Sequence, residues 1–91
     1  MNYRKESHTF INQAFNLLDK RKNSSTDSTI CAMLHKPFYL QISKNGKLSI
    51  REEGVKYNRG NTYNSGNTSM ITKIGKLLAT YLELLQTEVN E

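Results

Sequence analysis

The sequence predicts an α+β fold: an N-terminal amphipathic helix, a small antiparallel sheet of two to three strands with a hairpin over 38–51, a long loop and a C-terminal amphipathic helix. Apolar residues recur at three- and four-residue spacing near each end of the chain, as on one face of a helix. Between them, apolar and polar residues alternate around an Asn-Gly pair, as in a hairpin. A chain of 91 residues is the size of one domain. We therefore expect a single small domain over residues 1–91, and leave open whether the loop over 54–68 is mobile.

The first helix is predicted over residues 7–22, with Ser7 or Thr9 as its N-cap. The basic run Lys20–Lys22 would close it, where cations suit the negative end of the helix dipole. We prefer this structural explanation of the run to a nucleic-acid patch. The stripe expected to face the core consists of Phe10, Ile11, Ala14, Phe15, Leu17 and Leu18.

The last helix is the strongest helical signal and is predicted over residues 69–90, capped by Thr68 or Ser69. Its apolar stripe covers a wide arc, which would be buried if the helix were wedged between the sheet and the first helix. A second copy of the chain is the alternative cover, so a homodimer through this helix stays open. The stripe comprises Met70, Ile71, Ile74, Leu77, Leu78, Tyr81, Leu82, Leu84, Leu85 and Val89.

The central hairpin has two possible registers. A two-residue loop would pair Ile42 with Ser49 and so mix the apolar and polar faces. A loop over 44–46 instead pairs Ile42 with Leu48 and places Gly46 at the left-handed position of a bulge. We predict this second register, because the buried face decides the pairing. Its outward face would carry Tyr39, Gln41, Ser43, Lys47, Ser49 and Arg51.

Residues 29–35, upstream of the hairpin, fit two structures. A strand would place Ile30, Ala32 and Leu34 on one face, whereas a short helix would group Ile30, Cys31 and Leu34. We favour the strand and leave the helix open.

One hexapeptide, Tyr-Asn-x-Gly-Asn-Thr, occurs twice in succession before the last helix. Each copy fits a turn with Gly at its third position, and residues 55–57 and 62–64 could form a short hairpin around the first copy. Tyr57, Arg59 and Tyr63 are residue types that stack on bases or bind phosphate. The same composition suits a protein-binding loop, and a plain connector that arose by duplication is the third interpretation.

Composition narrows the classes of partner and compartment. The formal net charge of +5 favours an anionic partner, nucleic acid or an acidic protein surface, although it is also ordinary for a small soluble domain. A single cysteine, Cys31, excludes an internal disulfide and fits a reducing compartment. No apolar run approaches the roughly 18 residues of a membrane span, and the N-terminus has no apolar segment of signal-peptide length. We therefore expect a cytoplasmic protein without a membrane partner.

Few residues point to catalysis. Cys31 and His35 would share a face at a spacing of four and could form a nucleophile pair, but the apolar neighbours of Cys31 suit an inert thiol. Glu52 and Glu53 would point to opposite faces of a strand, which makes a poor acid–base pair. The sequence has no CxxC, HExxH or glycine-rich phosphate motif. We expect a non-enzyme with no catalytic residues, no cofactor and no metal site.

The start of the last helix is a candidate anion site. Lys73 and Lys76 stand near its positive dipole end, the reverse of the stabilising arrangement. These lysines and the free N–H groups could together hold an anion, and untuned surface charge is an equal alternative. Gly75, about one turn into the helix, would allow the close approach of a phosphate or a strand.

These features together predict a small binding protein whose leading partner is nucleic acid, DNA or RNA, held by basic and aromatic residues. The order of helix, strands and helix resembles the double-stranded RNA-binding domain in outline. In that family the second helix opens with a lysine-rich phosphate-binding stretch, and Lys73 and Lys76 have a comparable place here, whereas the rest of the family pattern is missing. The candidate binding residues are Tyr39, Lys47, Arg51, Tyr57, Arg59, Tyr63, Lys73 and Lys76.

The rival prediction is a protein-binding inhibitor or adaptor. A compact basic protein of phage or mobile-element type could block a larger nucleic-acid-processing enzyme, as anti-defence, anti-CRISPR and anti-restriction proteins do. The acidic end and wide apolar arc of the last helix suit this rival. A homodimeric regulatory module built on that helix is a third class.

Overall fold

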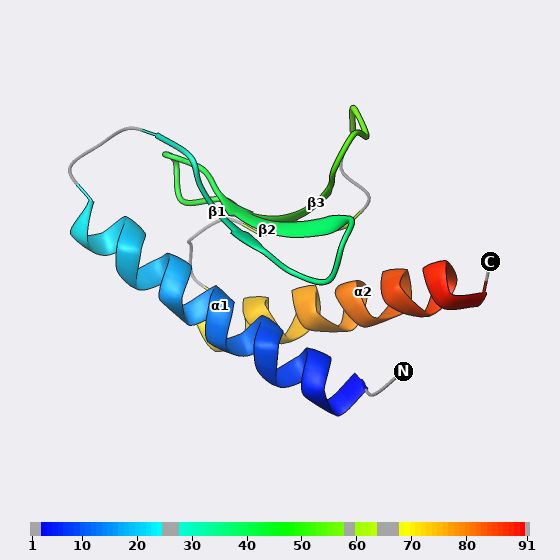
Figure 1. Ribbon diagram of the computed structural model, residues 1–91. Helices are drawn as coiled ribbons and strands as arrows, with labels where there is room; N and C mark the ends of the chain where they lie inside the picture. Colours follow the sequence, from blue (N-terminus) through cyan, green and yellow to red (C-terminus); the bar gives the residue numbers. More distant parts are fainter. Residues whose placement is uncertain (1–2, 25–27, 58–59, 64–67, 91) are drawn as a thin grey trace.

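The structure, a computed structural model, describes residues 3–24, 28–57, 60–63 and 68–90 and contains two helices and one antiparallel sheet. Both helices lie on the same side of the sheet, and neither covers its other face, here called the open face (Figure 1). The α+β prediction is confirmed, with four strands in the order β1-β2-β3-β4 rather than two to three. The elements are α1 (Tyr3–Asn23), β1 (Ile30–Met33), β2 (Phe38–Ile42), β3 (Leu48–Glu52), β4 (Thr62–Tyr63) and α2 (Met70–Asn90).

The start of α1 differs from the prediction. The helix begins at Tyr3, and Ser7, one of the two expected N-caps, lies inside it and donates its hydroxyl hydrogen bond to the Tyr3 carbonyl at 2.7 Å. The capping prediction was wrong because the first turns of α1 are polar, so the apolar periodicity that starts at Phe10 does not reveal them.

The other helix ends follow the expected chemistry. Lys20–Lys22 occupy the last turn of α1. The Arg21 guanidinium donates to the Ser28 carbonyl and so ties the end of α1 to the segment before β1. At the start of α2, the Ser69 carbonyl accepts the Lys73 N–H at 3.1 Å, as an N-cap residue does.

The hairpin has the predicted register. Ile42 lies opposite Leu48, and the Gly46 N–H closes the turn onto the Ser43 carbonyl at 3.0 Å. Gly46 has a φ of 86°, the left-handed conformation that glycine adopts without strain. Residues 30–33 form a strand paired with β2, so the strand interpretation of this segment is confirmed.

The core lies between the open sheet and the two helices, and Tyr81 is at its centre. Its ring stacks on Phe10 of α1, with centroids 5.4 Å apart, and meets Phe38 of β2 edge-on at 6.1 Å. All three side chains are fully buried, and burying an aromatic of this size stabilises the fold by roughly 1.5–3 kcal/mol. Phe15, expected in the same core, is 42 % exposed.

Most of the apolar arc of α2 is buried against other elements of the same chain. Ile74, Leu77, Tyr81 and Leu85 are buried in the core, whereas Ile71 is 71 % exposed. The helix therefore packs against both α1 and the sheet, which α1 also contacts directly, and a homodimer through α2 would have less apolar surface to cover.

The end of the first repeat copy, Gly60 and Asn61, lies against β3 and α2. Asn61 donates a side-chain hydrogen bond to the Thr80 hydroxyl of α2 at 2.9 Å, and Tyr63, at the start of the second copy, lies opposite Leu48 as part of β4. The hairpin predicted between residues 55–57 and 62–64 does not form, because β3 offers residues 62–63 a free sheet edge.

Close approach occurs at Gly60 rather than at Gly75. A Cβ at Gly60 would lie 3.1 Å from the Ile50 Cβ and 3.3 Å from the Thr80 Cγ2, whereas a Cβ at Gly75 would meet nothing within 4 Å. No strand of the described residues therefore approaches Gly75.

The difference between Gly60 and Gly75 predicts that substitution by alanine has opposite effects on stability at the two positions. Gly60→Ala should lower the free energy of unfolding by about 1–3 kcal/mol, because the added methyl overpacks against Ile50. Gly75→Ala should raise it by about 0.5–1 kcal/mol, because alanine costs less entropy inside a helix. Urea unfolding of both variants checks this. Equal stability of Gly60→Ala and the parent would show that the first repeat copy is not packed on β3 and α2.

Candidate nucleic-acid interface

The open face of the sheet carries the odd-numbered side chains of β1, β2 and β3. Tyr39 lies opposite both Met33 and Arg51, and Gln41 lies opposite Ser49 in the next row. The even-numbered residues of β2 and β3 are buried, so alternation sends these side chains away from the helices. The outward face predicted from the hairpin register is therefore present.

Part of this face forms a hollow of about 380 Å³. The lining side chains offer two cations, four hydroxyls and one amide, and none is a carboxylate. Ser49 points away from the helices, yet only 4 % of it is exposed. We therefore place it at the floor of the hollow. The lining residues are Thr29, Gln41, Ser43, Lys47, Ser49, Arg51 and Thr62.

Hydrogen bonds hold two parts of the hollow in place. The Nε of Arg51 donates to the Oε1 of Gln41 at 2.9 Å, which orients the guanidinium along the face. The Ser43 hydroxyl accepts the backbone N–H of Lys47 at 3.1 Å, which closes the base of the hairpin loop. Two positive side chains without a neighbouring acid in the lining make the hollow attractive to anions.

Three of the predicted binding residues come together on this face. Lys47 and Arg51 line the hollow, and Tyr39 lies directly opposite Arg51 on the next strand. Tyr39 is half-buried, so its ring is partly accessible beside the hollow.

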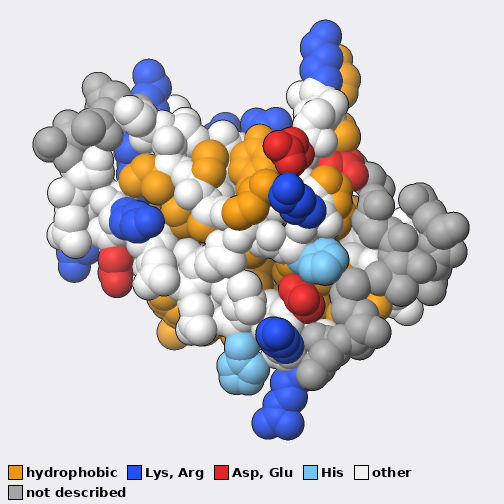
Figure 2. All heavy atoms as spheres, in the orientation of Figure 1, with side chains coloured by type: hydrophobic (Ala, Val, Ile, Leu, Met, Phe, Trp, Pro, Cys, Tyr) orange, Lys and Arg blue, Asp and Glu red, His pale blue; other side chains and the backbone are white. Residues whose placement is uncertain are grey.

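A fourth predicted residue, Tyr57, stands apart on a projection. Residues 53–57, here called the finger, are all exposed and project away from the two helices at the end of β3 (Figure 1). Tyr57 is 72 % exposed, and the Nζ of Lys56 lies 5.9 Å from its ring centroid. Figure 2 shows cationic and hydrophobic side chains side by side on this projection.

The remaining candidates that the structure describes do not join the open face. Tyr63 packs against the core, as its register opposite Leu48 requires. Lys73 is only 4 % exposed while Lys76 is exposed, so the two lysines do not present a shared surface at the start of α2. Arg59 lies outside the described residues.

Sequence reasoning missed two residues of the hollow, Thr29 and Thr62. Thr62 joins the face only because β4 pairs with β3, opposite Ser49. A two-residue strand has no alternation to detect, so only the three-dimensional pairing reveals it. Thr29 lies just before β1 and carries no signal of its own.

The surroundings of Cys31 oppose activation of its thiol. Burial raises the pKa of the Cys31 thiol, whereas an activated cysteine needs a lowered value. His35 lies in the turn after β1, with its Nδ1 3.8 Å from the Oε1 of Glu6. Within the part of the chain that the structure describes, no group of three His, Cys, Asp or Glu side chains is arranged to hold a metal ion. None of the described helices has the length and apolarity to cross a bilayer.

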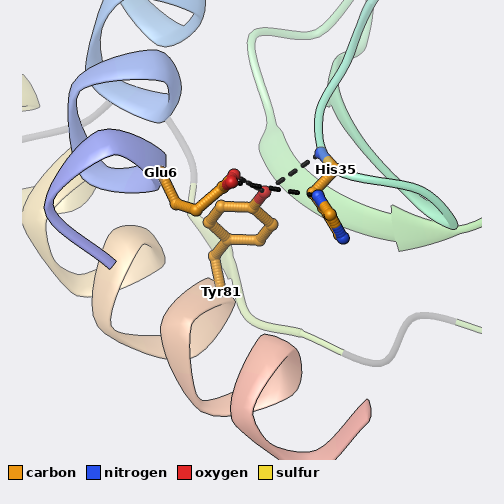
Figure 3. A network of polar contacts seen from close by, with 3 residues as sticks. All are labelled: Glu6, His35 and Tyr81. Atoms are coloured by element: carbon orange, nitrogen blue, oxygen red, sulfur yellow. Dashed lines mark hydrogen bonds and ion pairs between the residues drawn. The ribbon is translucent and has the colours of Figure 1, made fainter. Parts of the chain in front are cut away.

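A second polar cluster joins Glu6, His35 and Tyr81 (Figure 3). The Tyr81 hydroxyl accepts the backbone N–H of His35 at 3.1 Å and donates to the Oε2 of Glu6 at 3.3 Å. Burial raises the pKa of Tyr81 to about 12, and the charge of Glu6 adds to this effect. A phenol that resists ionisation suits neither a base nor a nucleophile. These contacts fasten α1 and α2 to the turn between β1 and β2.

No family model matches this chain, and no curated protein or solved structure is detectably similar to it. Its surfaces therefore have to be interpreted from their own chemistry.

The raised pKa of Tyr81 predicts a loss of stability in alkali. The pKa is about 12 in the fold and about 10 in an unfolded chain. The neutral phenol therefore stabilises the fold below pH 10, and this contribution of about 2–3 kcal/mol disappears as the pH rises through 12. Tyr81→Phe should be less stable at neutral pH and should lose less stability between about pH 10 and 12. Urea unfolding across this pH range checks the prediction. An equal loss of unfolding free energy with pH in the two proteins would contradict it.

Proposed function

We propose that the protein is a non-enzymatic nucleic-acid-binding protein of accessory or regulatory type, and that a single strand lies on the open face of its sheet. The observation that carries this proposal is the grouping of Lys47, Arg51 and Tyr39 on one face that neither helix covers. Cations that hold phosphates, next to an aromatic ring that stacks on a base, are the usual elements of single-strand recognition on a sheet.

A single strand fits this face better than a duplex. The longest strands, β2 and β3, have five residues each, and reading a duplex groove requires a helix or ribbon that projects into it. The hollow instead recedes into the face, and Ser49 at its floor is nearly fully buried. An unpaired strand can turn one backbone group inward and leave its base outside, against Tyr39.

A salt series tests the proposal. Labelled single-stranded DNA, single-stranded RNA and duplex should be titrated at several salt concentrations. We expect single strands to bind, with an affinity that falls linearly in log salt. Lys47→Gln with Arg51→Gln should weaken binding and reduce the slope, by about 0.7 for each single-strand phosphate contact that is lost. Tyr39→Ala should weaken binding by about 1–3 kcal/mol and leave the slope unchanged.

The matched control is Lys20→Gln with Lys22→Gln, which removes the same charge from exposed positions in the last turn of α1. This pair should retain most of the salt slope. Equal losses in the two double variants would mean that net charge, not the open face, attracts the strand. Absence of binding to every nucleic acid at about 50 mM salt would contradict the proposal itself.

The finger favours a second candidate function, binding to a protein. Val55 is 42 % exposed and Tyr57 is 72 % exposed on a segment that projects from the domain. Exposed apolar side chains that cluster on a projection are typical of protein contacts, and tyrosine is a frequent anchor in them. With Lys56 between them, these residues would suit an acidic groove, as in an inhibitor or adaptor of a larger nucleic-acid-processing enzyme.

The two candidate functions predict that different variants lose binding to the partner. For a protein partner that co-elutes with the chain in a stoichiometric complex, Tyr57→Ala should weaken the complex by about 1–2 kcal/mol or more, because truncating a buried anchor costs that much. Calorimetry on the purified complex would measure this. Lys47→Gln with Arg51→Gln should leave that complex intact. A complex that tolerates Tyr57→Ala but not the open-face variant would contradict the finger as its binding element.

A further inference from the structure

The chemistry of the hollow points to one part of a nucleotide. Its lining contains hydroxyls, an amide and two cations, with neither an aromatic ring nor a carboxylate. A base would find nothing to stack on there, and a divalent cation would meet two positive side chains. A volume of about 380 Å³ falls at the small end of ligand pockets, which leaves room for a phosphate and its attached sugar.

Arg51 is prepared for a bidentate contact. Its Nε is bound to Gln41 at 2.9 Å, so the two terminal Nη groups form the edge that remains for a ligand. Two parallel hydrogen bonds from such an edge match the oxygens of a phosphate. Because Gln41 already holds the guanidinium, less side-chain freedom is lost when the ligand binds.

The hydroxyls of the hollow are positioned to complete the contact. The Ser43 Oγ already accepts the Lys47 N–H, so the proton of this hydroxyl can be donated to a phosphate oxygen. Ser49, which is 4 % exposed, places a second hydroxyl at the floor of the hollow. The side chain of Lys47 stands at the rim and adds the second positive charge.

We propose that the hollow binds the sugar–phosphate unit of a nucleotide, with the phosphate held by Arg51, Lys47 and Ser43 and the sugar facing Ser49. This inference rests on the proposed nucleic-acid function and specifies which part of the strand the hollow takes. The base stays outside the hollow, within reach of Tyr39 in the neighbouring row. Recognition through the backbone is independent of base identity, so the site should accept any of the nucleotides.

The experiment follows backbone amide resonances of the intact chain during titration with uridine monophosphate, adenosine monophosphate, inorganic phosphate and uridine. We expect both nucleotides and, more weakly, phosphate to shift the amides of Gln41, Ser43, Ser49 and Arg51 in a saturable way. Uridine, which lacks phosphate, should leave them unmoved. Unmoved resonances with both nucleotides would overturn the inference.

Two variants and one control test the assignment of roles. Arg51→Lys keeps the charge but loses the bidentate edge, and should weaken nucleotide binding about tenfold. Ser49→Ala should weaken it several-fold. Lys44→Gln removes an exposed cation from the hairpin loop that does not line the hollow, and should bind as the parent does. A dispersed amide spectrum establishes that each variant is folded. Parental affinity in both Arg51→Lys and Ser49→Ala would overturn the inference.

Oligonucleotide titrations separate this inference from the proposed function. A single strand that binds the open face without shifting the amides of the hollow would support the proposed function and overturn the inference. Nucleotides that bind in the hollow, in a protein that ignores every oligonucleotide, would support a nucleotide site and overturn the proposed function.

Discussion

The rest of the structure depends on the packing of Tyr81. Its ring fills the space between Phe10 of α1 and Phe38 of β2, and its hydroxyl is held by Glu6 and by the backbone of His35. One side chain of α2 thus contacts the other helix, the sheet and the first strand connection. A domain of this size buries a modest core, so one aromatic that contacts all three parts accounts for much of their cohesion.

This arrangement leaves one face of the sheet open. Both helices lie on the same side, as is common for small antiparallel sheets with one solvated face. The alternation that buries Leu40 and Ile50 beneath the sheet places Gln41 and Arg51 above it. The candidate site is therefore a direct consequence of the core, because the register that satisfies the apolar residues also brings the two cations to one hollow.

The sequence predicted those elements whose register or periodicity is set by apolar residues on a single buried face. The hairpin register followed from pairing Ile42 with Leu48, and Gly46 supplied the required conformation. The polar first turns of α1 have no apolar period, so they were not predicted. Residues 62–63 form a strand, but it pairs with β3 rather than with residues 55–57. Solvent exposure was also hard to infer for single residues: Lys73 is almost entirely buried and Phe15 is not, since neither charge nor apolarity alone decides which side of a helix packs.

The duplicated hexapeptide shows why identical residues need not share a role. Tyr57 and Tyr63 open the two copies, yet Tyr57 is 72 % exposed on the finger whereas Tyr63 packs on the core opposite Leu48. The difference comes from β3, which offers a free edge to Thr62 and Tyr63 and none to the residues that leave it at Glu52. Gly60 and Asn61 then fasten the first copy to β3 and α2. Among the described residues of the repeat, Gly60, Asn61 and Tyr63 thus make structural contacts, Thr62 lines the hollow, and Tyr57 is an exposed aromatic.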